Sequence, residues 1–236
     1  MTRAVRRTPV LLRVASIVVA CGVLAAATAG ARQAPSRVHP ISGRVYAGAM
    51  DVSGAAWLDR PERDQEESTE RVLKLIGIER GSTVADVGAG SGYFTVRMAA
   101  QVGPDGRVYA NDIQQGMLDL VRRRVDKAKL KNVTLVLGSD DDPRLPSASV
   151  DLALLVDVYH EFLKPQAMLQ RLRDALKPGG RLVLLEYRQE DPNVPILPAH
   201  KMSVAGAKLE VEHEGFALTK VNEDLPWQHI LIFTRP

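Results

Sequence analysis

The stretch that decides the fold reads Val84-Ala85-Asp86-Val87-Gly88-Ala89-Gly90-Ser91-Gly92-Tyr93-Phe94. An apolar run is followed here by glycines at three alternate positions and then by residues suited to the start of a helix. Glycine lets a backbone come close to a ligand, and the free N–H groups at a helix start favour an anionic group. The stretch therefore predicts a strand, a glycine turn and a helix arranged around a nucleotide-like ligand.

Two other interpretations of the glycine turn compete with this one. A nicotinamide or flavin dinucleotide site has the pattern G-x-G-x-x-G, but here the third glycine comes one residue early and Tyr93 takes its place. A glycine turn without a ligand is disfavoured by the acids that follow. Asp112 lies about 20 residues on, where a carboxylate can bind both hydroxyls of a ribose. Ser139, Asp140 and Asp141 come after the next strand-like run and can bind an exocyclic amine.

Strand-like and helical patterns alternate along the rest of the chain. Strands are predicted over Thr83–Val87, Arg107–Asn111, Val133–Leu137, Val150–Val156 and Arg181–Tyr187. Helices are predicted over Tyr93–Gln101, Gln115–Lys129 and Gln166–Leu176. A further helix is expected to begin near Pro61 and to end at Gly77 or Gly81. This succession indicates a parallel, doubly wound sheet that is covered on both faces.

Two strand-like runs, Phe216–Asn222 and Gln228–Thr234, close the sequence and are separated by a short joint. Such a pair predicts an antiparallel hairpin at the edge of the sheet. The expected fold class is therefore α/β, with a Rossmann-like, doubly wound, mostly parallel seven-stranded sheet and an antiparallel C-terminal hairpin.

These motifs together resemble those of the class I S-adenosylmethionine-dependent methyltransferases. Residues 86–92 are similar to the first motif of the family, Asp112 to its ribose-binding acid, and Ser139-Asp140 to its adenine-contacting pair. Residues 176–182, which read Leu-Lys-Pro-Gly-Gly-Arg-Leu, resemble the segment before the family's fifth strand. The resemblance covers roughly residues 65–236 and is nearest to small-molecule enzymes of the ubiquinone/menaquinone C-methyltransferase group, type 11.

The resemblance implies S-adenosyl-L-methionine as the cofactor and a small molecule as the methyl acceptor. It places cofactor contacts at Asp86, Gly88, Ala89, Gly90, Gly92, Tyr93, Asp112, Ile113, Ser139, Asp140 and Asp157. The implied chemistry is in-line attack by an acceptor nucleophile on the sulfonium methyl, for which the protein supplies orientation and desolvation.

His160, Glu161 and Tyr187 are the candidate catalytic residues, because they lie at the ends of the fourth and fifth predicted strands. His160 can take a proton from an acceptor hydroxyl, since its ordinary pKa lies near neutrality. The alternative is that these side chains only orient the next helix or solvate a loop. Asp157, His160, Glu161 and His200 can also converge on a divalent metal, as in some catechol-type methyltransferases. Because the sequence lacks a specific carboxylate signature, we expect no metal.

Composition and charge narrow the other function classes. The chain has 236 residues, of which 45% are hydrophobic and 25% charged, and this excludes low-complexity and disulfide-stapled proteins. Its one cysteine, Cys21, can form no internal disulfide. The net charge is +3, but residues 1–31 hold four arginines and no acid, so residues 32–236 carry −1. A nucleic-acid-binding surface is therefore not indicated.

The N-terminus has the pattern of an export signal. Four arginines precede the uncharged run of residues 14–31, which ends in small residues. The same run is just long enough for an uncleaved membrane anchor, which would associate the protein with a membrane. Cys21 also loosely fits a lipoprotein box. A misassigned start, with Met50 as the true first residue, would instead leave the protein cytoplasmic.

We therefore expect residues 1–31 to be a signal peptide or anchor and residues 32–60 to be a linker or arm, with Trp57 and Leu58 folding over the domain. Residues 61–236 form the expected methyltransferase domain, exported to a periplasmic or secreted location. S-adenosylmethionine is made in the cytosol, whereas the leader predicts export away from it. The second hypothesis is therefore a non-catalytic protein that binds an adenosyl ligand. A nicotinamide-dependent oxidoreductase is less favoured because of the glycine spacing.

Mass spectrometry of the mature protein tests the export signal. We expect a chain that begins after Ala29 or Ala31, because both end an A-x-A sequence behind the apolar run. An intact Met1, or a chain that begins at Met50, would contradict cleavage.

Overall fold

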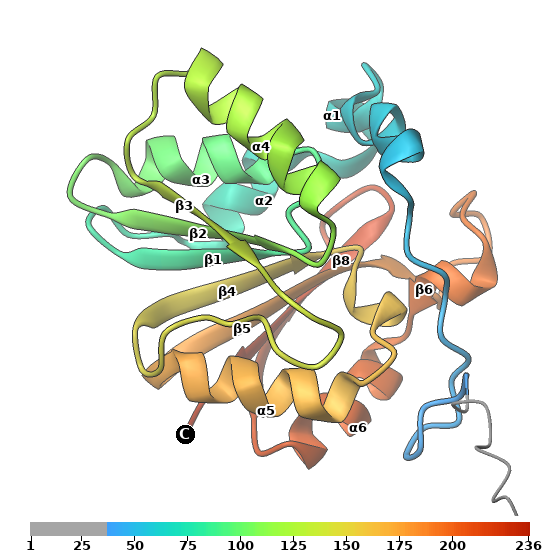
Figure 1. Cartoon of the computed structure of the whole chain (residues 1–236). Coiled ribbons are helices and arrows are strands. Elements are labelled where there is room, and N and C mark those ends of the chain that lie inside the picture. The colour runs from blue at the N-terminus through green and yellow to red at the C-terminus, as the bar shows by residue number, and fades with distance from the viewer. Residues whose placement is uncertain (1–36) are drawn as a thin grey trace, which may run out of the picture. The chain divides into compact units, whose positions relative to one another are not determined.

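The central sheet confirms the predicted α/β fold (Figure 1). The computed structural model describes residues 37–236, so the predicted leader lies outside the described residues. The strands are β1 (Thr83–Val87), β2 (Arg107–Asp112), β3 (Val133–Leu137), β4 (Val150–Val156), β5 (Leu176–Arg188), β6 (Lys201–Met202), β7 (Ala217–Asn222) and β8 (Gln228–Thr234). Seven of them run in the order β3-β2-β1-β4-β5-β8-β7, and the short β6 pairs with β5 off this path.

Parallel pairing joins β1 to both β2 and β4, and β4 in turn to β5. Only the hairpin strand β8 is antiparallel to its neighbours β5 and β7, as the two C-terminal runs predicted. The chain order reverses between β1 and β4, and in open α/β sheets this switch point is where ligands bind.

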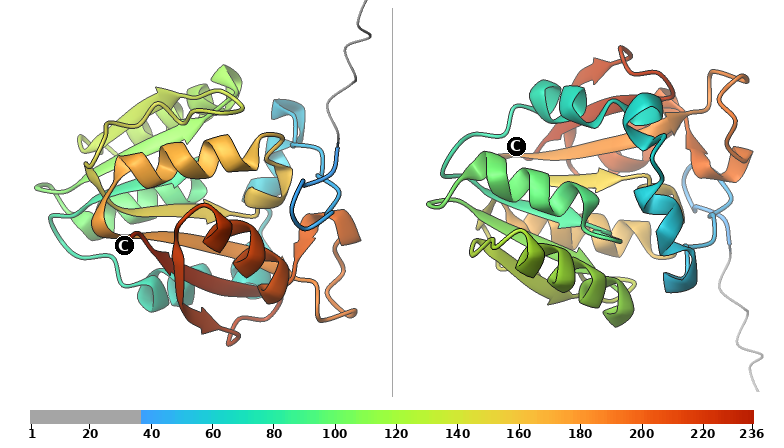
Figure 2. Two further views of the ribbon diagram at one scale, coloured as in Figure 1. Left: turned by 90° about the horizontal axis from the view of Figure 1, so that it is seen from below. Right: turned by 90° about the horizontal axis from the view of Figure 1, so that it is seen from above.

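Helices cover both faces of the sheet (Figure 2). They are α1 (Arg63–Glu67), α2 (Thr69–Ile76), α3 (Tyr93–Val102), α4 (Gln115–Lys127), α5 (Pro165–Ala175) and α6 (Val204–His213), with 3-10 turns η1 (Val52–Asp59), η2 (Tyr159–Glu161) and η3 (Pro198–His200). One face carries α2, α3 and α4, and the other carries α5 and α6. Among residues 37–236, no helix combines the length and the apolar character needed to cross a membrane.

The strands alternate their side chains between two apolar clusters, one on each face. Along β4, Leu152 and Leu154 belong to the cluster that includes α2 and α3, whereas Ala153 and Leu155 belong to the cluster of α5 and α6. All four side chains are almost fully buried. This is why the runs read as continuously apolar in the sequence.

The helix predicted from Pro61 is divided in two by Ser68, whose φ of 51° ends α1 and begins α2. The break accompanies the burial of the Glu67 carboxylate, which accepts hydrogen bonds from Arg60 at 2.9 Å and Arg63 at 2.7 Å. The sequence pattern that predicted one continuous helix gave no sign that the Glu67 side chain faces inward. Gly77 then caps α2, as one of the two predicted ends.

Replacing Leu154 with alanine tests the packing of the central strand. The side chain is fully buried, so we expect Leu154→Ala to lower the free energy of unfolding by about 2–5 kcal/mol, through lost burial and a residual cavity. Urea denaturation measures this. Leu209→Ala is the matched control, since Leu209 is 51% exposed on α6 and should change stability by less than about 0.5 kcal/mol. Equal effects of the two substitutions would contradict the assignment of the core.

Candidate active site

A cavity of about 690 Å³ opens at the carboxyl ends of β1, β4 and β5, at the switch point of the sheet. Its size is in the range of small-molecule sites. The loops that follow these strands line it together with part of the N-terminal arm, residues 46–50 and 57–58. The predicted glycine turn, the acid after β2 and the histidine after β4 all reach this cavity.

The glycine turn lies against the cavity at two positions. Gly88 and Gly90 both line it, with φ of 74° and 52°. A Cβ at Gly88 would lie 2.5 Å from Val158, and one at Gly90 would lie 2.7 Å from Leu58. Both positions therefore favour glycine over any residue with a side chain. Ala89 and Gly92 belong to the turn but do not line the cavity. Gly92 instead packs against α4 at Val121.

Asp112 ends β2 and faces the cavity from beside the glycine turn. Its carboxylate accepts hydrogen bonds from the backbone N–H groups of Gly90, at 3.0 Å, and Gln114, at 2.9 Å. Two N–H groups do not use all four lone-pair positions of a carboxylate, so further hydroxyl donors can be accepted. Burial raises the pKa of Asp112, and the two backbone hydrogen bonds partly oppose this effect. Ile113 and Asp140 also line the cavity.

Asp86, Tyr93 and Ser139 lie away from the cavity wall. The buried Asp86 carboxylate accepts a hydrogen bond from the Thr95 hydroxyl at 2.5 Å and thereby ties β1 to α3. The Tyr93 hydroxyl donates to Asp64 at 2.6 Å. Ser139 donates to Asp141 within its own loop. These three residues are thus placed to shape the neighbouring loops.

Asp157 follows β4 and lines the cavity with a strained backbone, at φ of 51°. One carboxyl oxygen accepts a hydrogen bond from Gln228 at 2.7 Å, while the other is buried without a hydrogen-bond partner among residues 37–236. Burial raises the pKa of Asp157 well above its usual value, and the nearby carboxylates of Glu67 and Glu186 add to this effect. One oxygen of Asp157 thus stays unpaired at the wall of the cavity, within the part of the chain that the structure describes.

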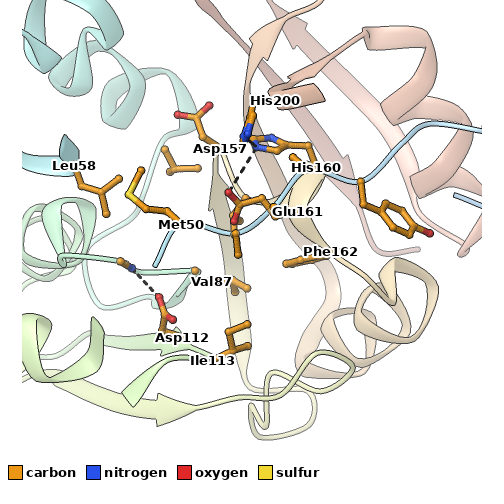
Figure 3. Close-up of a pocket in the computed structure, with 18 of the residues that line it drawn as sticks. Met50, Leu58, Val87, Asp112, Ile113, Asp157, His160, Glu161, Phe162 and His200 are labelled. Atoms are coloured by element: carbon orange, nitrogen blue, oxygen red, sulfur yellow. Dashed lines mark hydrogen bonds and ion pairs between the residues drawn. The ribbon is translucent and has the colours of Figure 1, made fainter. Parts of the chain in front are cut away.

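A second polar group lies across the cavity from Asp112 (Figure 3). His160 and Glu161 come from η2, after β4, and His200 ends η3. The Nε2 atom of His160 lies 3.0 Å from Nδ1 of His200 and 4.0 Å from Oε1 of Glu161. On its other side, Nδ1 of His160 lies 2.6 Å from the buried carboxylate of Glu186 on β5. Burial raises the pKa of Glu161 to about 7.

Tyr187 lines the cavity from β5, and its hydroxyl donates to Glu67 at 3.3 Å. Burial and the carboxylates of Asp157 and Glu67 raise the pKa of Tyr187. The phenol is therefore held as a neutral hydrogen-bond donor. The three candidate catalytic residues thus share one cavity, although their roles in a reaction stay predictions.

The arm supplies cavity residues that the sequence did not predict as site residues. The predicted linker runs from residue 37 along the cavity, where Gln114 donates to the Met50 carbonyl at 2.8 Å and Ala47 donates to the His160 carbonyl at 3.1 Å. Trp57 and Leu58 line the cavity. His200, which the sequence offered only as a metal ligand, completes the polar group together with Glu186, which directly precedes the predicted Tyr187. No local motif marks His200, since it is 40 residues from His160 in the sequence.

Comparisons with known proteins point to methyltransferases. A family model described as a methyltransferase domain matches residues 84–180. Demethylmenaquinone methyltransferases of Listeria welshimeri and Symbiobacterium thermophilum are 30% and 37% identical over 126 and 107 residues, covering 53% and 45% of this chain. Those matches span 52% and 43% of the relatives, so the chain spans about half their length or less. A crystal structure of a SAM-dependent methyltransferase from Aquifex aeolicus, 29% identical, superposes with a TM-score of 0.75 over 80% of this chain and 100% of that one.

The pH dependence of stability tests the burial of Asp86. Burial raises its pKa from 3.8 to about 6, so the protonated form stabilises the fold below pH 3.8 and this stabilisation is lost as pH rises through 6. The Asn side chain of Asp86→Asn does not titrate. We therefore expect the free energy of unfolding of this variant to rise by on the order of 3 kcal/mol, relative to that of the unsubstituted chain, between pH 4 and 7. Urea denaturation across this range measures the difference. Asp126→Asn, on the exposed end of α4, is the control, and a difference for Asp86→Asn that stays constant with pH would contradict the raised pKa.

Proposed function

The chain belongs to the class I S-adenosylmethionine-dependent methyltransferases, and we propose that it transfers the methyl group of S-adenosyl-L-methionine to an apolar small molecule that carries a hydroxyl group. One observation carries the proposal: the bare glycine backbone and Asp112 face one end of the cavity, and a polar group of side chains faces the other. An adenosyl ligand and an acceptor can thus meet between them.

The residues at the first end fit the cofactor that the family implies. Asp112 retains acceptor positions for ribose hydroxyls, and Gly88 and Gly90 present their backbone to the cavity wall. Asp157 lines the same cavity, and its carboxyl group is the proposed partner of the ammonium group of the methionine portion. Acidic side chains around the cavity also favour a cationic sulfonium. When bound, the cofactor supplies an electrophilic methyl carbon.

The apolar character of the acceptor follows from the rim of the cavity. Trp57, Ile113, Leu163 and Leu197 all line it, yet they are 43% to 71% exposed. Large apolar side chains gathered at the mouth of a cavity mark a binding surface for an apolar molecule. A hydrophobic ring or chain that enters there would bury this surface.

The names of the relatives support a ring compound of the quinol type. Demethylmenaquinone methyltransferases act, by name, on a demethylated menaquinone, and the present chain matches about half of their length or less. In the proposed reaction the acceptor hydroxyl would pass its proton to the polar group or to water. The nucleophilic atom of the acceptor would then take the methyl group, and S-adenosylhomocysteine would leave. His160, Glu161 and His200 meet the hydroxyl group, while Tyr187 and Asp157 line the same cavity.

We also propose that the protein works outside the cytoplasm, through the export signal of residues 1–31. Attachment by an uncleaved anchor over residues 14–31 would hold the cavity near a membrane, where apolar quinols reside. This proposal rests on the sequence pattern of the leader.

Turnover with defined acceptors tests the reaction. We expect release of S-adenosylhomocysteine when the chain is given S-adenosylmethionine with hydroquinones that carry an apolar substituent, and slower release with unsubstituted hydroquinone, because the rim is apolar. Binding of S-adenosylmethionine without turnover over such a panel would instead support the non-catalytic protein. Binding of NAD alone would contradict the methyltransferase proposal.

Asp112→Ala tests the cofactor end. We expect a loss of affinity for S-adenosylhomocysteine of roughly tenfold or more, because hydrogen bonds to a charged carboxylate are removed. Isothermal titration calorimetry measures the dissociation constant. Asp126→Ala is the matched control on exposed α4 and should leave the affinity unchanged. Unchanged affinity in Asp112→Ala would remove this residue from the site.

A further inference from the structure

We propose that His160, Glu161 and His200 form a binding site for a divalent first-row transition metal at the acceptor end of the cavity (Figure 3). This departs from the expectation of no metal, and it goes beyond the proposed methyl transfer, since the site can be tested without cofactor or acceptor. Two imidazoles and one carboxylate are a common ligand set for such ions, which keep further positions open for substrate or water.

The three ligand atoms are spaced for one ion. Nε2 of His160, Nδ1 of His200 and an Oε of Glu161 all lie within 4.8 Å of one another, and the two nitrogens are 3.0 Å apart. Nitrogens that share an ion at about 2.1 Å lie roughly 3.0 Å from each other in octahedral coordination and roughly 3.4 Å in tetrahedral coordination. The histidine pair therefore already has a separation close to that of two ligands to a common metal, and the Glu161 carboxylate lies near enough to provide the third ligand.

Glu186 orients His160 in the manner of an outer-shell carboxylate. Its Oε2 lies 2.6 Å from Nδ1 of His160, and its Oε1 accepts a hydrogen bond from the Tyr159 backbone at 2.9 Å. A proton on Nδ1, bound to this carboxylate, leaves the lone pair of Nε2 directed at His200 and Glu161. Metal-bound histidines are typically held in this way.

The charges around the cluster favour a cation. Glu161 is mostly buried and Glu186 fully buried, and within residues 37–236 His160 is the one basic side chain that lies within 4.0 Å of either carboxylate. Arg44, the nearby guanidinium, instead binds Glu210 and the backbone carbonyl of His160. Two buried carboxylates thus share one imidazole, whereas a divalent ion would balance both.

The ligand atoms also indicate which metals fit. Imidazole nitrogen suits zinc, iron, cobalt and nickel, whereas magnesium prefers oxygen ligands and retains its water. A cation at this position can bind an acceptor oxygen and lower the pKa of its hydroxyl, so that the proton passes to water. This assigns His160 to metal binding in place of direct proton abstraction.

Metal titration of the full chain tests the proposal. The protein is prepared without a histidine tag, stripped with a chelator, and titrated with Co²⁺, Zn²⁺ or Mg²⁺ alone. We expect one equivalent of Co²⁺ to bind and to give weak visible absorption bands without the charge-transfer band of a cysteine ligand, which separates this site from Cys21. Zn²⁺ should displace Co²⁺, and Mg²⁺ should not.

Substitutions locate the bound ion. His200→Ala and Glu161→Gln should each weaken Co²⁺ binding by about 100-fold, and Glu186→Gln by about 10–100-fold through loss of orientation. His213→Ala, an exposed histidine on α6, is the matched control and should bind as the unsubstituted chain does. Circular dichroism and thermal unfolding report whether each variant folds, and Glu161→Gln is nearly isosteric.

Absence of Co²⁺ binding, or equal binding in His200→Ala, Glu161→Gln and His213→Ala, would overturn the metal site. Affinity for S-adenosylhomocysteine is measured in the same variants and should change less than about twofold, because Asp112 lies at the other end of the cavity. If the chain binds S-adenosylhomocysteine but not Co²⁺, the metal proposal fails and the methyltransferase proposal stands. If the unsubstituted chain binds Co²⁺ but not S-adenosylhomocysteine, only the methyltransferase proposal fails.

Discussion

The parallel pairing of β1, β4 and β5 is the constraint on which the rest of the structure depends. Parallel strands require crossover connections, so helices must cover both faces and the strands between them become apolar on both sides. The register aligns Val87 with Leu155 and Val156 with Leu185, so the three strands end at one edge. The glycine turn, the η2 loop and Glu186 are thereby brought to the same cavity, although about 100 residues separate the first from the last.

The parts that the sequence predicted well are those set by local chemistry. The bounds of β1, β3, β4 and β8 agree with the predicted runs, because glycine, proline and polar residues border each apolar stretch. Asp112 lies beside the glycine turn as predicted, because its distance from the turn along the chain is fixed by one helix and one strand. The same local reasoning placed His160 and Glu161 directly after β4.

The parts that it missed depend on contacts between distant segments. The arm from residue 37 has no periodicity, yet Arg44 binds the buried carboxylate of Glu210 on α6 and Arg60 binds that of Glu67. Removing one partner of such a buried pair leaves an uncompensated charge, which is costly, so each pair holds the arm firmly. Nothing in the arm alone reveals these partners, and the break at Ser68 belongs to the same arrangement.

Glu186 links the sheet to the chemistry at the acceptor end. It lies on β5, but its two oxygens hold the Tyr159 backbone and the His160 ring of the loop that follows β4. The direction of the imidazole is therefore set by the pairing of two central strands and not by the loop alone. Because the strand register is fixed by the buried alternation of Leu184 and Leu185 between the two faces, slippage by one residue would turn Glu186 away from His160. The geometry of the polar group is thus a consequence of the apolar core.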